Sequence, residues 1–188
     1  MKYHELAPGL RVYPRALPNP QLLIEKSLED SSRWAESATG SQRAGDNKVR
    51  DHIRRSMSYA PPRDDADWAV ARGRIMSAAN HYHDHYRTTW DKELAPLSLL
   101  RYQDAKGFYV AHIDDSPGNP RAFSALVYMN DVPRGGETYF TEFGIGIQPK
   151  AGDIAVFPAS YPYQHEARMP LEGEKFVLVT FMPRHRKS

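Results

Sequence analysis

Two histidines and one aspartate are the residues of this sequence whose types and spacing could hold a metal ion. His112 and Asp114 stand two residues apart, at the end of an expected strand, where side chains two positions apart point to the same face. His165 supplies a third candidate ligand after another expected strand. The chain has no cysteine, so any metal must be held by nitrogen and oxygen. Imidazole and carboxylate together suit Fe(II), and three such ligands leave three octahedral positions open.

A lysine near this triad indicates a second binding function. Lys175 comes ten residues after His165 and opens the apolar run 176–181. A cation that faces the core there would need a partner of opposite charge. A bound dicarboxylate would be such a partner, whereas a lysine that ends the strand would extend its ammonium into water.

The elements that must position these residues change in kind near residue 96. Before it, residues 20–28 predict a short amphipathic helix with Asn19 as a plausible N-cap. Asp64 or Asp65 is expected to cap a second helix, which should lie against a sheet. Residues 34–63 are polar and rich in glycine and arginine, which predicts a long loop with at most one short strand. The part of it from Gly40 to Arg63 is the expected substrate lid.

After residue 96 the sequence predicts a series of short strands separated by turn residues. They span 97–102, 107–113, 123–129, 137–140, 144–148, 153–157 and 175–182. Strands spaced in this way without intervening helices argue against a parallel sheet and favour an antiparallel sandwich or barrel. We therefore expect a mainly β fold, a jelly-roll core with supporting helices.

Composition limits the class of protein. The 188 residues suit one domain, divided into helical support and lid (1–96) and a jelly-roll core (97–183). The formal charge of +2 is too small for an electrostatic footprint on nucleic acid, so no nucleic-acid partner is expected. No apolar run is long enough to span a membrane, and the start lacks the apolar core of a secretory signal. We expect a soluble, cytoplasmic protein with no membrane partner and leave its oligomeric state open.

Many motifs in one order carry a resemblance to a known family. They are Tyr102, Tyr109-Val110-Ala111-His112-Ile113-Asp114, Arg121, Leu126-Val127-Tyr128-Met129-Asn130, Gly135-Gly136-Glu137-Thr138-Tyr139-Phe140, Ile147-Gln148-Pro149-Lys150-Ala151-Gly152, Phe157, His165 and Gly173-Glu174-Lys175. Over roughly residues 99–182 the chain resembles the prolyl 4-hydroxylase-type Fe(II) and 2-oxoglutarate-dependent oxygenases. Relatives often carry a tryptophan near the end of the last strand, where this chain has Phe181.

The resemblance implies a fold, a reaction and a set of site residues. The fold is a double-stranded β-helix, the jelly roll of cupins. Its iron ligands, which make up the catalytic centre, would be His112, Asp114 and His165. Lys175 would pair with the far carboxylate of 2-oxoglutarate, and Tyr102 and Tyr128 would lie near this cosubstrate. Fe(II), 2-oxoglutarate and O2 are the implied cofactors, with ascorbate as a candidate addition.

Several functions stay open at this point. The resemblance favours hydroxylation of an unactivated C–H bond, foremost in a prolyl residue of a peptide or protein. Hydroxylation of a free amino acid or another small molecule is the main alternative, because the triad does not distinguish the substrates. Nucleic-acid demethylation is less favoured, since relatives of that kind end in paired arginines. A non-catalytic jelly roll that binds a metal is a further alternative, against which Lys175 argues.

A second group of histidines could in principle bind zinc. His81 and His85 share a face of the second expected helix, whereas His83 points elsewhere. No general base or thiol stands near them in the sequence, so solvent-facing histidines are the favoured interpretation.

Overall fold

Two antiparallel sheets face each other in the computed structural model, which describes residues 1–40 and 47–184. Among these residues the larger sheet has eight strands in the order β1-β2-β14-β10-β17-β8-β7-β3. These strands are β1 (His4–Ala7), β2 (Leu10–Tyr13), β14 (Ile154–Pro158), β10 (Arg121–Tyr128), β17 (Lys175–Pro183), β8 (Ser98–Tyr102), β7 (Met57–Tyr59) and β3 (Trp34–Glu36). The sheet thus combines strands from both halves of the sequence.

The smaller sheet carries five strands within the described part of the chain, in the order β13-β12-β15-β9-β6. They are β13 (Ile145–Ile147), β12 (Thr138–Phe140), β15 (His165–Ala167), β9 (Phe108–His112) and β6 (Arg54–Arg55). Two short pairs complete the strands, β11 (Arg134–Gly135) with β16 (Pro170–Glu172) and β4 (Thr39–Gly40) with β5 (Asn47–Lys48). This arrangement is the expected double-stranded β-helix.

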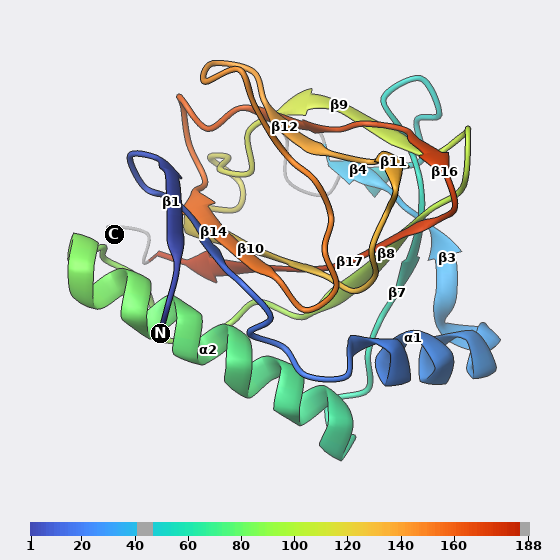
Figure 1. The fold of residues 1–188 in the computed structure, drawn as a ribbon, viewed down its shortest axis with the longest axis horizontal. Coiled ribbons are helices and arrows are strands. Elements are labelled where there is room, and N and C mark those ends of the chain that lie inside the picture. Colours follow the sequence, from blue (N-terminus) through green and yellow to red (C-terminus); the bar gives the residue numbers. More distant parts are fainter. Residues whose placement is uncertain (41–46, 185–188) are drawn as a thin grey trace.

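Two helices cover the outer face of the larger sheet, on the side away from β9 and β12 (Figure 1). Helix α1 (Pro20–Glu29) begins with proline after Asn19, whose side chain makes no capping hydrogen bond. Helix α2 (Ala66–Tyr86) begins after Asp65, and the Asp65 carboxylate accepts hydrogen bonds from two backbone amides of the first turn. A 3-10 turn, η1 (Ser31–Arg33), follows α1. Both expected helices are therefore confirmed.

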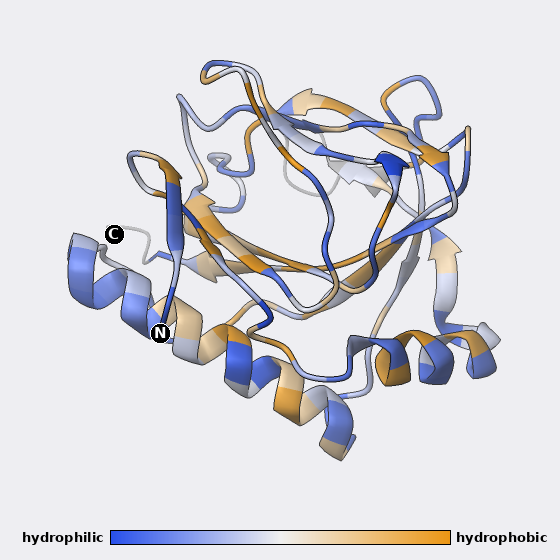
Figure 2. Ribbon diagram, viewed as in Figure 1, coloured by the Kyte–Doolittle hydropathy of each residue, from blue (hydrophilic) through white to orange (hydrophobic). Residues whose placement is uncertain are grey.

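The central strand β10 divides the core into two layers because its side chains alternate between the faces of the sheet. Phe123, Ala125 and Val127 belong to the layer beneath α2, which also contains Trp68. Tyr128 instead belongs to the layer between the two sheets. Figure 2 shows hydrophobic residues along β10 and β14, which lie between both layers. Apolar packing on both faces fixes the strands that border the site.

The first half of the chain differs from the expectation of helices and a loop. Strands β1 and β2 precede α1, and β3, β6 and β7 lie in the segment expected to be a loop. β7 pairs with β8, and β6 pairs with β9. These strands have two to four residues each, and all but β1 pair with strands distant in the sequence, so local patterning carried little signal. Residues 41–46 of the expected lid, including Arg43, lie outside the described residues.

Candidate active site

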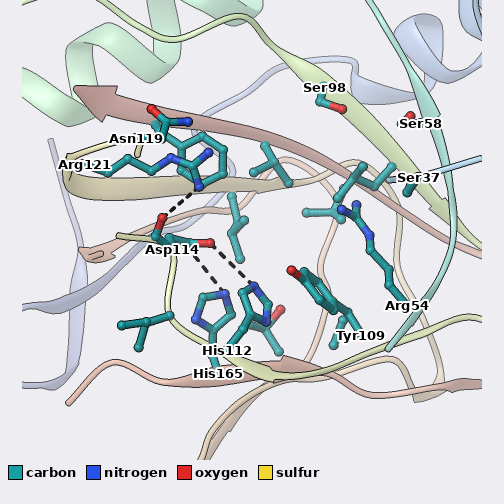
Figure 3. A pocket seen from close by; sticks show the side chains of 18 of the residues that line it. Ser37, Arg54, Ser58, Ser98, Tyr109, His112, Asp114, Asn119, Arg121 and His165 are labelled. Carbon is teal, nitrogen blue, oxygen red and sulfur yellow. Dashed lines mark hydrogen bonds and ion pairs between the residues drawn. The ribbon is translucent and has the colours of Figure 1, made fainter. Parts of the chain in front are cut away.

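The histidines of the predicted triad meet across two neighbouring strands. His112 ends β9 and His165 opens β15, and the two residues are direct partners in this antiparallel pair. Their ring centroids lie 4.5 Å apart (Figure 3). The sequence predicted only that His165 follows a strand, and in the structure it begins the next one. Sheet pairing therefore brings together two histidines that are 53 positions apart in the sequence.

Asp114 completes the cluster from just outside the strand. Since β9 ends at His112, the expected strand geometry does not extend to Asp114. Its backbone amide instead donates to the Ala159 carbonyl at 3.0 Å, and Ser124 Oγ donates to Asp114 Oδ2 at 2.6 Å. Each of the three side chains offers one ligand atom, and these atoms all lie within 4.8 Å of one another.

The imidazoles are oriented so that their Nε2 atoms face the carboxylate. His112 Nε2 lies 3.5 Å from Asp114 Oδ1, and His165 Nε2 lies 3.8 Å from Asp114 Oδ2. On the far side of each ring, Nδ1 lies 2.9 Å from the Val110 carbonyl and 3.0 Å from the Tyr163 carbonyl, respectively. A carbonyl oxygen only accepts, so each Nδ1 carries the proton and each neutral ring keeps a lone pair on Nε2.

Electrostatics favour the protonation states that a metal ion requires. Burial opposes ionisation of Asp114, but the nearby His165 and His112 imidazoles and the Ser124 hydroxyl outweigh it, so the pKa of Asp114 lies well below its usual range. Burial lowers the pKa of His165 to about 4, although Asp114 acts in the opposite direction. The site therefore presents an anionic carboxylate and a neutral imidazole near neutral pH.

Lys175 lies in the same cavity as the triad. This cavity has a volume of about 830 Å³ and is lined by all three triad residues and by Lys175. Lys175 is 1% exposed, and its Nζ lies 3.4 Å from Thr138 Oγ1. No carboxylate pairs with it among the described residues. Burial lowers its pKa to about 7, partly offset by the charge of Glu137.

Both predicted tyrosines surround this lysine. Tyr102 is the cross-strand partner of Lys175 in the β8–β17 pair, and Lys175 Nζ lies 5.5 Å from its ring centroid. The Tyr128 ring lies 5.7 Å from the same nitrogen. The Tyr128 hydroxyl is buried without a hydrogen-bond partner among the described residues, and burial raises the pKa of Tyr128 above its usual range. The Lys175 ammonium thus lies near both tyrosine rings, of which that of Tyr102 lines the cavity.

Two arginines stand on opposite sides of the triad (Figure 3). The Arg54 guanidinium lies 4.8 Å from the centroid of the Tyr109 ring, which stacks on His112 at 3.7 Å. The Arg121 guanidinium packs on the Phe181 ring at 3.4 Å and donates from Nη1 to the Asp114 carbonyl at 2.9 Å. Both side chains line the cavity and leave donors for a bound molecule.

Two hydroxyls at the site were not singled out by sequence reasoning. Ser124 contacts Asp114, and a polar residue inside the apolar strand 123–129 was an available signal. Thr138 contacts Lys175, although the Gly135–Thr138 segment was expected to serve only as a turn into a strand.

The helical histidines do not gather into a metal cluster among the described residues. His81 Nδ1 lies 3.2 Å from the Tyr13 hydroxyl, and His83 Nδ1 contacts the Thr88 carbonyl at 2.6 Å. These contacts support a structural role for that group.

Comparison with known proteins finds one family to which part of the chain is similar. Residues 97–183 match the sequence model of the 2OG-Fe(II) oxygenase superfamily. The match covers the jelly-roll segment of the chain, which is therefore similar to members of that superfamily. Its members use Fe(II), 2-oxoglutarate and O2, which is consistent with the His-Asp-His cluster of this chain. No curated protein matches the chain by sequence.

Solved structures share the fold of this chain at low sequence identity. A Pseudomonas putida prolyl-4-hydroxylase has 20% identity and a TM-score of 0.73, over 94% of this chain and 93% of the other. A viral collagen prolyl hydroxylase from Paramecium Bursaria Chlorella virus-1 has 17% identity and a TM-score of 0.70, over 94% and 97%. A Trichoplax adhaerens prolyl hydroxylase, in complex with a hypoxia inducible factor peptide fragment, has 15% identity and a TM-score of 0.72, over 93% and 83%.

Among the described residues, none of the helices is long and apolar enough to cross a membrane.

Proposed function

We propose that this protein is an Fe(II)- and 2-oxoglutarate-dependent oxygenase that hydroxylates a prolyl residue in a peptide or protein, with Fe(II) held by His112, Asp114 and His165. The observation that carries the proposal is the placement of three metal-ligand atoms and one buried lysine in a single cavity. A metal-binding jelly roll without oxygen chemistry would need the triad but would have no use for a buried ammonium beside it.

The three side chains fit a divalent iron ion. The distances from the histidine Nε2 atoms to the Asp114 oxygens, 3.5 and 3.8 Å, exceed those of good hydrogen bonds. The lone pairs of these atoms therefore point into the space between the three side chains. Each Nδ1 is bound to a backbone carbonyl, which is how metal-binding histidines are usually oriented. Two imidazoles and one carboxylate without thiolate form the donor set of non-haem Fe(II) oxygenases.

Lys175 fits the distal carboxylate of 2-oxoglutarate. It is a fully buried ammonium without an ion-pair partner in the described part of the chain, which is costly until an anion arrives. Thr138 Oγ1 supplies a further polar group 3.4 Å from this ammonium, and Tyr102 lines the cavity beside it. Leu126 and Val177 also line the cavity there and would exclude water from the bound cosubstrate.

Each side chain then has a defined task in the reaction. Bound Fe(II) supplies the oxidising chemistry, in which O2 and 2-oxoglutarate give succinate, carbon dioxide and one oxygen atom inserted into a substrate C–H bond. Ser124 holds the Asp114 carboxylate, and the backbone carbonyls behind His112 and His165 hold both imidazoles. Lys175 fixes the far end of the cosubstrate, so its reacting end has one orientation.

The substrate would lie across the triad between the two arginines. Arg54 and Arg121 offer donors on opposite sides of the cavity, which suits the spaced carbonyl groups of an extended peptide. The prolyl-hydroxylase fold of the structural neighbours supports the same substrate class. One arginine could instead bind the carboxylate of a free amino acid, so we keep that as the second candidate.

Mass spectrometry of reaction mixtures tests the substrate assignment. The protein is incubated with Fe(II), 2-oxoglutarate, ascorbate and either a proline-rich peptide, the same peptide with alanine for proline, or free proline. We expect one added oxygen atom in the proline peptide alone, and no product with His112→Ala. Oxidation of free proline but not of peptides would favour the second candidate. Folded, iron-loaded protein that consumes no 2-oxoglutarate with any substrate would contradict the proposal.

A further inference from the structure

Both triad imidazoles are oriented by a hydrogen bond to a backbone carbonyl, but the two carbonyls lie in different kinds of segment. His112 Nδ1 donates to the Val110 carbonyl and His165 Nδ1 to the Tyr163 carbonyl, each two residues earlier in the chain. Val110 lies inside β9, which is paired on both sides, with β15 and with β6. Tyr163 instead precedes β15 in an irregular segment. The carbonyl that orients His165 therefore needs an anchor outside the sheet.

The phenol of Tyr163 provides such an anchor at the N-terminal end of the chain. Its hydroxyl donates to the carbonyl of Pro8, which lies in the turn between β1 and β2 and 155 positions away in sequence. The Tyr163 ring also packs near Phe143, with centroids 5.3 Å apart, and its backbone amide donates to Ser160. Side chain and backbone of one residue thus join the N-terminal turn to an imidazole of the triad.

The turn that accepts this bond is itself firmly held. The Gly9 amide donates to Glu5 Oε1 at 3.0 Å and is 3.1 Å from the Tyr86 hydroxyl. The Tyr82 hydroxyl donates to the Gly9 carbonyl at 2.9 Å. Arg11, fully buried, donates from Nε and Nη2 to Glu5 Oε2, both at 3.2 Å. Because Tyr82 and Tyr86 belong to α2, the Pro8 carbonyl is fixed to a long helix and cannot easily follow a displaced phenol.

We propose that Tyr163 is a positioning residue of the metal site, which couples the N-terminal turn to the orientation of His165. The inference rests on the proposed function, in which His165 is an iron ligand. Loss of the phenolic hydroxyl would free the Tyr163 backbone, and the imidazole would lose part of its preorganisation. Metal affinity should therefore depend on a contact made by the first ten residues of the chain.

Tyr163→Phe tests this directly because it removes one oxygen atom and keeps the ring. The affinity of the full chain for Co(II), an air-stable substitute for Fe(II), is measured by calorimetric titration. Removal of groups that bind a metal ligand directly costs about 10- to 100-fold in affinity, so a group one step further away should cost about 3- to 10-fold. Tyr161→Phe is the matched control, since that side chain is 71% exposed and its hydroxyl is 3.5 Å from Glu142. The control should bind Co(II) like the wild type.

A magnetic resonance readout separates positioning from general loosening of the fold. In the Co(II)-loaded protein, the Nδ1 protons of both imidazoles shift away from the other signals and can be followed individually. We expect Tyr163→Phe to speed solvent exchange of the His165 proton and to leave the His112 proton unchanged. Equal exchange for both histidines, together with unchanged Co(II) affinity, would overturn the inference and leave Tyr163 a packing residue.

Gly9→Ala disturbs the contact between Tyr163 and the N-terminal turn by a change in the turn. The new Cβ would lie 2.9 Å from the Tyr163 hydroxyl, at a residue with φ of +75°. We expect weaker Co(II) binding in Gly9→Ala, but no additional loss when Gly9→Ala is combined with Tyr163→Phe, because both act through one contact. Additive losses of affinity would overturn the inference. If the wild-type protein did not bind Co(II), both the proposed function and this inference would be overturned. If Tyr163→Phe bound Co(II) as tightly as the wild type, only this inference would be overturned.

Discussion

Replacement of Lys175 by methionine should weaken 2-oxoglutarate binding and stabilise the protein without ligand. Methionine keeps the unbranched shape of the side chain and removes only the ammonium. In the structure this ammonium is 1% exposed, with Thr138 Oγ1 at 3.4 Å and no carboxylate partner among the described residues. The two effects have opposite signs because the charge is useful only when the cosubstrate is bound.

The size of each effect follows from the burial of the charge. A buried ion pair that loses one partner costs about 3–5 kcal/mol, which corresponds to a 2-oxoglutarate Kd raised by about 150- to 5,000-fold. Without cosubstrate, replacement of a lone buried charge by an apolar group should raise the free energy of unfolding by about 1–4 kcal/mol. For a chain of this length that is a melting temperature higher by roughly 3 °C or more.

The pH dependence provides a second signature of Lys175. Its pKa in the folded protein is about 7, against a usual 10.5. Between these values the unfolded chain binds a proton that the folded chain lacks, so the stability of the ligand-free protein rises with pH across this window. Binding of 2-oxoglutarate requires the charged form, so its affinity should fall as pH rises above about 7. Lys175→Met should lose both dependences.

Calorimetric titration with 2-oxoglutarate and thermal unfolding of the ligand-free protein measure these effects. Lys150→Met is the matched control, because Lys150 is exposed, and it should change neither. If Lys175→Met bound 2-oxoglutarate within threefold of the wild type, the reasoning from the buried charge would be refuted. A lower melting temperature of Lys175→Met would refute the claim that the unpaired charge destabilises the ligand-free protein.

Three further substitutions test other parts of the structure. Ser124→Ala should weaken Co(II) binding about tenfold, measured by titration, because the hydroxyl holds Asp114 at 2.6 Å. Asp65→Ala should lower the free energy of unfolding in urea by about 1–2 kcal/mol through loss of the α2 cap, whereas the exposed neighbour Asp64→Ala should have little effect. Gly152→Ala should cost more, about 2–4 kcal/mol in the same assay, because φ is +84° and the new Cβ would lie 2.5 Å from a backbone carbonyl oxygen.

Much of the site could be predicted because its residues belong to a series of motifs in one order. A histidine and an acid two apart, or a lysine at the start of an apolar strand, is a weak signal alone. The order in which these residues occur with His165 and the other motifs of the resemblance made the prediction possible. The structure places His112, Asp114, His165 and Lys175 in one cavity, and their roles toward iron and cosubstrate stay predictions. The turn-separated runs after residue 96 likewise gave β8, β9, β10 and β17 close to their observed bounds.

The rest depends on contacts between distant segments. Strands β3, β6 and β7 have two or three residues each. β7 pairs with β8 and β6 with β9, and β3 pairs with β7 in turn. The contact from Tyr163 to Pro8 spans 155 positions, and no local pattern distinguishes that tyrosine from other aromatic residues. Such long-range pairing must be observed in three dimensions.

The central claim is that the triad holds Fe(II) where 2-oxoglutarate can chelate it beside Lys175. Absorption spectroscopy without oxygen tests it most directly, with Fe(II) added first and 2-oxoglutarate second. We expect a visible charge-transfer band in the wild-type protein that His165→Ala, folded by circular dichroism, does not give. Absence of the band from folded, iron-loaded wild-type protein, or its persistence in His165→Ala, would contradict the account.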